Sequence, residues 1–187
     1  MRLFVAIDID EAARKAIAAE QQRIKGEIET GSSLKWIRSE HMHLTLAFIG
    51  EVEESRAEPL VRAMSAPITG VEPFEIVFGG LGVFPPEGAP RVLWLGVSSG
   101  AAQVIDTQAA IADRLARLDV PREPRPFHPH LTLARWRDGR PRDRRRINAV
   151  RPSEDIGRTH VNEVTLYESR LSSAGPAYTA VARAGLL

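Results

Sequence analysis

The pentapeptide His43-Leu44-Thr45-Leu46-Ala47 recurs, residue for residue, as His130-Leu131-Thr132-Leu133-Ala134. The two copies lie 87 positions apart in a chain of 187 residues. Side chains alternate between the two faces of a strand, so each histidine shares a face with the threonine two positions later, while the two leucines point into a core. The repeated pentapeptide therefore predicts two equivalent strands, each with one polar and one buried face.

The same offset of 87 relates other expected elements. A strand is expected from Phe74, and a second one is expected 87 positions later, from Val161. A helix is expected from Ser55, and a weaker helical pattern begins 87 positions later, at Arg142. Because one offset aligns several elements, we interpret the chain as two copies of a strand–helix–strand–helix–strand unit related by a pseudo-twofold axis. We expect a single bilobed domain over residues 1–187.

Cap and turn signals bound these elements. Ser55 and Glu58 have the spacing of a capping box, which places Pro59 in the first turn of its helix, and Gly79-Gly80 is typical of a turn. We expect strands over 3–7, 43–49, 74–78, 92–97, 130–133, 161–167 and 178–184, and helices that begin at Asp10 and end at Gly31, begin at Ser55, begin after Gly100, and span 142–150.

The composition excludes several classes of protein. With 43% hydrophobic and 26% charged residues the chain is neither disordered nor fibrous, and without cysteine it has no thiolate ligand or thiol nucleophile. No apolar run has the length of a membrane span, and the apolar stretch 1–7 reaches Asp8 at once, unlike a secretory signal. We expect a cytoplasmic monomer that makes no contact with a membrane.

The two polar faces carry the predicted chemistry. A pseudo-twofold axis would bring His43 and Thr45 toward His130 and Thr132 across one cleft. Two imidazoles suit general acid–base catalysis near neutral pH. Two threonine hydroxyls suit donation to phosphate oxygens that gain charge in a transition state. Such a site needs neither a metal nor a covalent intermediate, and the residues alone do not say which histidine is the acid.

A metal site is the alternative for the same histidines. The chain contains His41-Met42-His43 and His128-Pro129-His130, and His-x-His pairs can bind first-row metals. A carboxylate in phase on these strands would be expected at such a site, and none is present. We therefore expect no metal and no cofactor, and we place His41 and His128 at strand entries or at the rim of the cleft.

A basic segment follows the second pentapeptide. Residues 135–151 contain eight arginines and two aspartates, a local charge of +6 in a chain whose formal net charge is +1. Such a segment can attract a polyanion. The chain has 22 arginines and only three lysines, so arginine also serves wherever any positive charge is needed.

These motifs resemble the 2H phosphoesterase superfamily, which is named for two His-x-Thr/Ser-x motifs. More narrowly, the chain is similar to the RNA 2′,3′-cyclic phosphodiesterases, first described as bacterial 2′-5′ RNA ligases. The resemblance covers essentially the whole chain. It is carried by Arg2-Leu3-Phe4-Val5-Ala6-Ile7-Asp8, by residues 43–52, by Pro126-Phe127-His128-Pro129-His130 with the following Leu131-Thr132-Leu133-Ala134-Arg135, and by stretches 166–169 and 175–178.

The resemblance implies an α+β fold with two antiparallel sheets that face each other across a cleft, with helices outside. It implies hydrolysis of a terminal 2′,3′-cyclic phosphate on RNA to a 2′-phosphate and a 3′-hydroxyl. By carry-over, His43 is the general acid, His130 is the general base, and Thr45 and Thr132 hold phosphate oxygens. Arg135 fits the motif and is a possible substrate contact, but strand parity places it opposite His130 unless the strand bulges.

Other readings of this site stay open. The same residues would serve 2′-5′ RNA ligation, and the substrate could be a small cyclic phosphate instead of RNA. A module that only binds RNA ends is a further alternative, although binding alone needs no paired histidines. Phe4, Trp36 and Tyr178 are candidates for stacking on a base, with core packing as the competing explanation.

Overall fold

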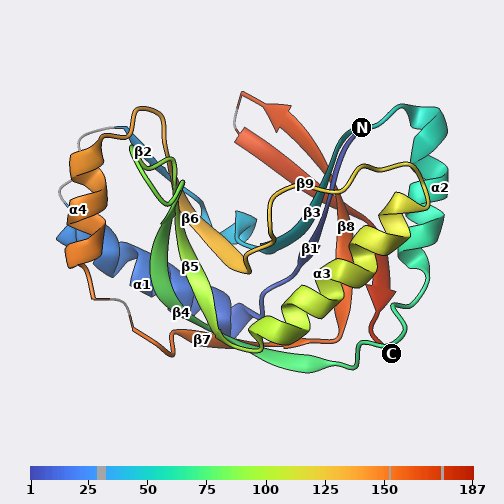
Figure 1. The fold of residues 1–187 in the computed structure, drawn as a ribbon, viewed down its shortest axis with the longest axis horizontal. Helices are drawn as coiled ribbons and strands as arrows, with labels where there is room; N and C mark the ends of the chain where they lie inside the picture. Colours follow the sequence, from blue (N-terminus) through green and yellow to red (C-terminus); the bar gives the residue numbers. More distant parts are fainter. Residues whose placement is uncertain (29–32, 152, 174) are drawn as a thin grey trace.

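Two antiparallel sheets stand at an angle to each other, with helices on their outer sides (Figure 1). The computed structural model describes residues 1–28, 33–151, 153–173 and 175–187. Within these residues the elements are β1 (Arg2–Ile7), α1 (Glu11–Glu27), β2 (Leu34–Trp36), η1 (Ser39–His41), β3 (Leu44–Glu51), α2 (Glu54–Ser65), β4 (Phe74–Phe84), β5 (Val92–Ser99), α3 (Ala101–Ala116), β6 (His130–Trp136), α4 (Pro141–Ala149), β7 (Gly157–Val161), β8 (Glu163–Ser172) and β9 (Gly175–Gly185).

The sheets have corresponding strand orders. One, which we call the His43 sheet, has the order β3-β1-β8-β9; the other, the His130 sheet, has the order β2-β6-β5-β4-β7. In the His43 sheet, β3, which directly follows His43, pairs with β1, the first strand of the first half of the chain. In the His130 sheet, β6, which begins with His130, pairs with β5, the first strand of the second half. Each sheet is then extended by a strand from the other half, β8 in one and β4 in the other. The halves therefore exchange strands instead of forming one sheet each.

Helices α1 and α3 each pack against the sheet that does not contain the strand before them. Helix α1 follows β1 of the His43 sheet but packs against β7 of the His130 sheet, and α3 follows β5 of the His130 sheet but packs against β3. Figure 1 shows α1 and α4 beside the His130 sheet and α2 and α3 beside the His43 sheet. None of the helices in the described residues is long and apolar enough to cross a membrane.

The leucines of both pentapeptides are in the core, as the alternation predicted. Leu44 and Leu131 are fully buried, and Leu46 and Leu133 lie in the same hydrophobic cluster. Removal of four leucine side chains from water stabilises the fold by several kilocalories per mole, at about 25 cal/mol per Å² of apolar surface. This anchorage leaves the opposite face of each strand free to carry polar side chains.

Several predicted boundaries need correction. The helix expected from Ser55 begins at Glu54 with Glu53 as N-cap and no side-chain cap, so Pro59 lies inside the helix and not in its first turn. Strand β4 continues through Gly79-Gly80, where a shift of register absorbs the expected turn. Helix α1 ends at Glu27, and Gly31 lies outside the described residues.

The strand predicted over 161–167 is two strands. Strand β7 ends at Val161 and pairs with β4, whereas β8 begins at Glu163 and pairs with β1 in the other sheet. The chain bends at Asn162, between them. An apolar run that continues across a bend looks the same in the sequence as one strand, which explains the error.

Candidate functional site

His43 and His130 stand at matching places in the two sheets. His43 immediately precedes β3, and His130 is the first residue of β6. Thr45 and Thr132 follow them on the face away from the buried leucines, and all four side chains are partly exposed. His130 and Thr132 pair with Gly96 and Trp94, two residues apart on β5, so these two side chains share a face.

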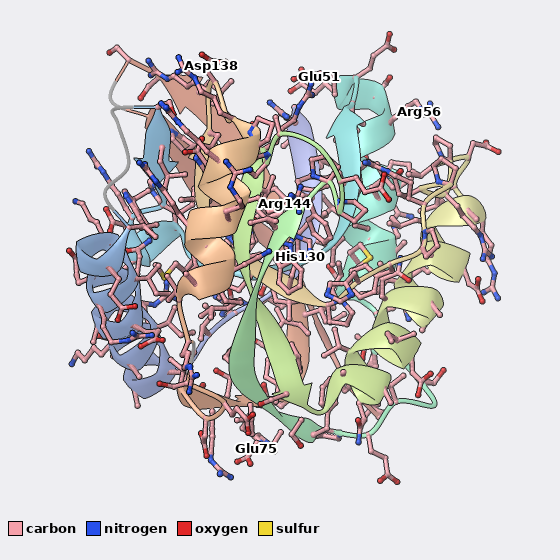
Figure 2. All side chains as sticks on the ribbon, turned by 60° about the vertical axis from the view of Figure 1, so that its left-hand side comes forward. Glu51, Arg56, Glu75, His130, Asp138 and Arg144 are labelled. Atoms are coloured by element: carbon pink, nitrogen blue, oxygen red, sulfur yellow. The ribbon has the colours of Figure 1, made fainter. Side chains whose placement is uncertain are left out.

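The two strands meet although they belong to different sheets. Strands β3 and β6 contact each other, and a short link over residues 37–43 carries the chain from β2 in one sheet to β3 in the other. The charge of Arg135 acts on His130 and also on Tyr178, whose ring lies 5.4 Å from that of His43. Figure 2 shows Glu51, the last residue of β3, and Asp138, two residues beyond the end of β6, along the same edge of the molecule.

His43 lies among aromatic rings. Its imidazole stacks on Phe4 with ring centroids 4.9 Å apart, meets Tyr178 edge-on, and lies 6.5 Å from Tyr167. A pocket of about 410 Å³ opens beside it. The pocket is lined by Asp8, Arg14, Glu40, His41, Met42, His43, Tyr167, Pro176, Ala177 and Tyr178.

Asp8 supplies a carboxylate to this pocket. Its Oδ1 accepts a hydrogen bond from the hydroxyl of Tyr167 at 2.5 Å, and its Oδ2 accepts one from the hydroxyl of Thr165 at 2.8 Å. Two donors fix the carboxylate in place, and its negative charge acts on His43. Burial and the bond to Asp8 both raise the pKa of the Tyr167 hydroxyl, which therefore stays a donor.

His130 also lies among aromatic rings. Phe84 meets its ring edge-on with centroids 5.0 Å apart, and Trp94 lies 6.2 Å away. The indole of Trp94 occupies the space over Gly82, where an added Cβ would lie 2.1 Å from the ring. His130 Nδ1 is 2.7 Å from the carbonyl oxygen of His128, which fixes the ring orientation. The charges that act on this imidazole from the described part of the chain are cationic, those of His128 and Arg135.

Burial lowers the pKa of both histidines. It lowers the pKa of His43 to about 4; a hydrogen bond to the backbone of His41 and the charge of Asp8 oppose this change, and the charge of Arg14 adds to it. It also lowers the pKa of His130, where a backbone hydrogen bond to His128 opposes the change and the positive charges of His128 and Arg135 add to it. Both imidazoles are therefore neutral in the free protein near pH 7.

The same break in register follows both threonines. Opposite β1, Leu46 is left without a partner because Ala6 pairs with Thr45 and Val5 with Ala47. Opposite β5, the residue left over is Leu133, at the equivalent place in the second pentapeptide. Such bulges redirect the side chains that follow them and are frequent beside active sites.

The bulges change the predicted parity of the next side chains. After the bulge, Arg135 pairs with Val92, two residues from the Trp94 that pairs with Thr132, so Arg135 shares a face with Thr132. The objection from strand parity to a role for Arg135 is thereby removed. At the equivalent position of β3, Phe48 pairs with Phe4 and shares a face with Thr45.

Two arginines brace the segments beside the histidines. Arg14 donates to the carbonyl oxygens of Ser39 at 2.6 Å and Met42 at 3.2 Å, which holds the turn that leads into His43. Arg144 donates to the carbonyl oxygens of Pro85 and Gly88, in the loop that follows Phe84. Figure 2 shows Arg144 on α4, above His130 in that view. At least one arginine of the basic segment is thus engaged within the fold.

The remaining candidate residues differ in exposure and surroundings. Phe4 is 4% exposed and is part of the core, whereas Trp36 and Tyr178 are partly exposed. His41 and His128 both border the aromatic clusters, as expected of cleft-rim residues, and His160 is exposed. Among the described residues, no three His, Asp or Glu side chains come together in a way that could hold a metal ion.

Three residues at the site, Asp8, Tyr167 and Phe48, are not among the candidates predicted from the sequence. Asp8 directly follows the first strand, and its two hydrogen-bond partners lie 157 and 159 positions away, so no local pattern links them. The bulge in β3 puts Phe48 on the face of Thr45, which simple alternation along the strand does not predict. The signal that was available for Phe48 is the offset of 87, which aligns it with Arg135.

Comparison with known proteins finds one matching family and relatives that share one name. The family description "2′-5′ RNA ligase superfamily" matches residues 13–172. A protein named RNA 2′,3′-cyclic phosphodiesterase from Aquifex aeolicus is 34% identical, with 89% of each chain covered. One of the same name from Methanothermobacter thermautotrophicus is 33% identical, with 96% of this chain and 95% of the relative covered.

Solved structures resemble the whole fold. TT0787 of Thermus thermophilus has a TM-score of 0.80 at 27% identity and covers 99% of this chain and 97% of its own. LigT of E. coli in its apo form has a TM-score of 0.75 at 26% identity, with coverages of 99% and 96%. LigT has also been solved in complex with 3′-AMP; that structure has a TM-score of 0.75 at 27% identity, with coverages of 99% and 97%.

Proposed function

Since the chain belongs to the 2′-5′ RNA ligase superfamily, we propose that it hydrolyses 2′,3′-cyclic phosphate ends of RNA to a 2′-phosphate and a 3′-hydroxyl. Relatives that carry the name RNA 2′,3′-cyclic phosphodiesterase support this substrate class. We further propose that one bilobed domain over residues 1–187, with an internal repeat, carries the activity.

One observation carries the proposal. Two His–Thr pairs stand on strands that contact each other, in matching positions and with the same bulge after each threonine. A core requires leucines at the buried positions of these strands but gives no reason to repeat polar side chains in phase. A phosphorus atom bound between the strands would have an imidazole and a hydroxyl on each side.

The two histidines have separate tasks in this reaction. His130, neutral because of its burial, accepts a proton from the water that attacks phosphorus. His43 donates a proton to the departing 3′-oxygen, so the P–O3′ bond breaks as the new P–O bond forms. His43 must be protonated first, and the anionic substrate together with Asp8 provides the negative charge that favours this state.

The hydroxyls and Arg135 act on the phosphate. Thr45 and Thr132 donate to the non-bridging oxygens, whose charge increases in the transition state. Arg135, on the same face as Thr132, adds a positive charge that the bulge brings to this side of β6. These groups supply the stabilisation that a metal provides in other phosphoesterases, and we propose that the reaction is metal-independent.

The test is the product of a defined RNA. We expect an oligoribonucleotide with a 2′,3′-cyclic phosphate end, incubated with the protein in EDTA, to yield a 2′-phosphate. A 3′-phosphate product would contradict the assigned leaving group, and a lack of turnover would contradict the proposed activity. Activity that is lost in EDTA and restored by zinc or manganese would instead favour a metal at the histidines.

Ligation at the same site is the second candidate, because the matching family is named for 2′-5′ RNA ligases. In that reaction a 5′-hydroxyl replaces water as the nucleophile, with the same base and acid. Addition of an RNA with a free 5′-hydroxyl to the assay separates the two reactions, since ligation lengthens the RNA through a 2′-5′ bond and hydrolysis does not.

A further inference from the structure

Two cations stand directly opposite each other in the His130 sheet. Lys35 is the middle residue of the edge strand β2, and it pairs in register with Arg135 of β6. Residues directly opposite each other in an antiparallel pair point to the same face, with Cβ atoms about 4.5–5.5 Å apart, and like charges there destabilise the sheet. Both side chains are exposed, and neither forms an ion pair within the described part of the chain.

The bulge in β6 turns this pair of cations to the face that carries Thr132. Arg135 pairs with Val92 and Thr132 pairs with Trp94, two positions apart on β5, so Lys35 and Arg135 share the face of Thr132. The two rows are separated by about 7 Å at the usual rise of an antiparallel strand. The charge of Arg135 also acts on the imidazole at the start of β6. The pair therefore lies beside the proposed site of the cyclic phosphate.

The row that contains the two cations includes no carboxylate. Across β2, β6, β5 and β4 it consists of Lys35, Arg135, Val92 and Phe84. A lysine on an edge strand can serve to prevent pairing with another chain, but that role gives no reason for an arginine directly opposite. A negatively charged ligand would remove the repulsion between the two cations. An RNA chain supplies one negative charge with each nucleotide, so it is suited to this place.

We propose that Lys35, with Arg135 beside it, binds the internucleotide phosphate on the 5′ side of the terminal nucleotide of the RNA. This inference rests on the proposed function, because the cyclic phosphate bound between the histidines defines where the next phosphate lies. One nucleotide of sugar–phosphate backbone can span the gap between Thr132 and the row of Lys35. Lys35 therefore favours an RNA end over a mononucleotide, without a preference among bases, since contacts to phosphate carry no sequence information.

The experiment varies the charge of one phosphate and of one side chain. One substrate is a dinucleotide that ends in a 2′,3′-cyclic phosphate, and the other is the same dinucleotide with an uncharged methylphosphonate linkage. We expect Lys35→Gln to raise KM for the phosphodiester by about 3–5-fold, the value of one exposed ion pair, and KM for the methylphosphonate by less than about 2-fold. Lys35→Arg should restore the low KM. Lys25→Gln, at an exposed lysine of α1, is the matched control.

A binding measurement separates this inference from the proposed function. The affinity for a fluorescein-labelled oligoribonucleotide, followed by anisotropy, should depend less on salt in Lys35→Gln, with the slope of log K against log [salt] smaller by about 0.7 for one lost phosphate contact on a single strand. Equal effects of Lys35→Gln on the two dinucleotides would assign Lys35 to the cyclic phosphate and overturn the inference. Unchanged KM values together with an unchanged slope would also overturn it. If the parent protein hydrolyses neither dinucleotide, the proposed function fails, and the slope alone decides whether Lys35 binds the RNA backbone.

Discussion

The His43 and His130 sites share a backbone plan but differ in chemistry. Each histidine stands at the start of a strand, two residues before a threonine and three before a bulge. Both imidazoles lie among aromatic rings, and both feel the charge of an arginine, Arg14 at His43 and Arg135 at His130. Only at His43 does the charge of a carboxylate, that of Asp8, also act on the imidazole among the described residues. The comparison teaches that a repeated motif can meet two different chemical settings once the neighbouring strands differ.

The proposed roles make different demands on two imidazoles, although burial lowers the pKa of both. A general acid must be protonated, which a nearby negative charge favours, and a general base must be neutral, which an apolar setting favours. The sequence could not assign these tasks, since the pentapeptides are identical. The carboxylate of Asp8 is one feature that distinguishes the two halves, and its charge favours a protonated His43.

The largest expected effects come from removal of either histidine. We expect His43→Ala and His130→Ala each to lower kcat by about 10²–10⁴-fold, the usual contribution of a general acid or base. The double variant should lose little more than the worse single variant, because both groups act in one displacement. Steady-state rates on a cyclic-phosphate RNA measure this, with His160→Ala at the exposed histidine as control. A parental rate in either variant would refute the paired mechanism.

The threonines should show a smaller and more symmetrical effect. Thr45→Val and Thr132→Val keep the shape but remove the hydroxyl, and we expect each to lower kcat/KM by about 10–100-fold through the loss of one donor to the phosphate. Thr45→Ser and Thr132→Ser, which keep the hydroxyl, should recover most of the rate. If the valine and serine variants are equally impaired, the threonines act through packing and not through donation.

The strand pattern and the paired motifs were readable from the sequence because they are local. Alternation and the offset of 87 placed the four catalytic candidates on one face of each strand, and the fold class followed from the family resemblance. The face on which Arg135 lies was left conditional on a bulge, because one extra residue in a strand reverses the face of every residue beyond it. The alternation of polar and apolar residues does not show where a strand bulges, so the bulge could not be located from the sequence.

Contacts distant in the sequence were out of reach for a different reason. Asp8 bonds to Thr165 and Tyr167 because β1 and β8 are neighbours in the His43 sheet. That pairing requires the last part of the chain to cross into the sheet begun by the first. The bend at Asn162 makes the crossing, and it is the same feature that the predicted single strand over 161–167 concealed.

Acid should destabilise the fold through His43. Its pKa is lowered to about 4 in the folded protein, below that of an unfolded histidine, so the unfolded state binds more protons between these values. Stability is therefore full above about pH 6.5 and falls as the pH is lowered toward 4, by about 1–2 kcal/mol for this partly exposed group. Urea unfolding at pH 7 and pH 4.5 should show a smaller loss in His43→Asn than in the parent or in His160→Asn. An equal loss in all three would contradict the assignment.

The sharpest test of the comparison is Asp8→Asn, although its effect is the smallest. The carboxylate raises the pKa of His43, so its removal lowers that pKa further, by about one unit or less for an opposite charge at this range. Activity that requires protonated His43 is lost as the pH rises through the pKa in the bound complex, so the alkaline limb of the kcat profile should move to lower pH while the acidic limb stays. Glu40→Gln, which neutralises another carboxylate of the same pocket, is the matched control. Movement of the acidic limb instead would exchange the roles of the two histidines, because a base must lose its proton and a lower pKa would then extend activity into acid.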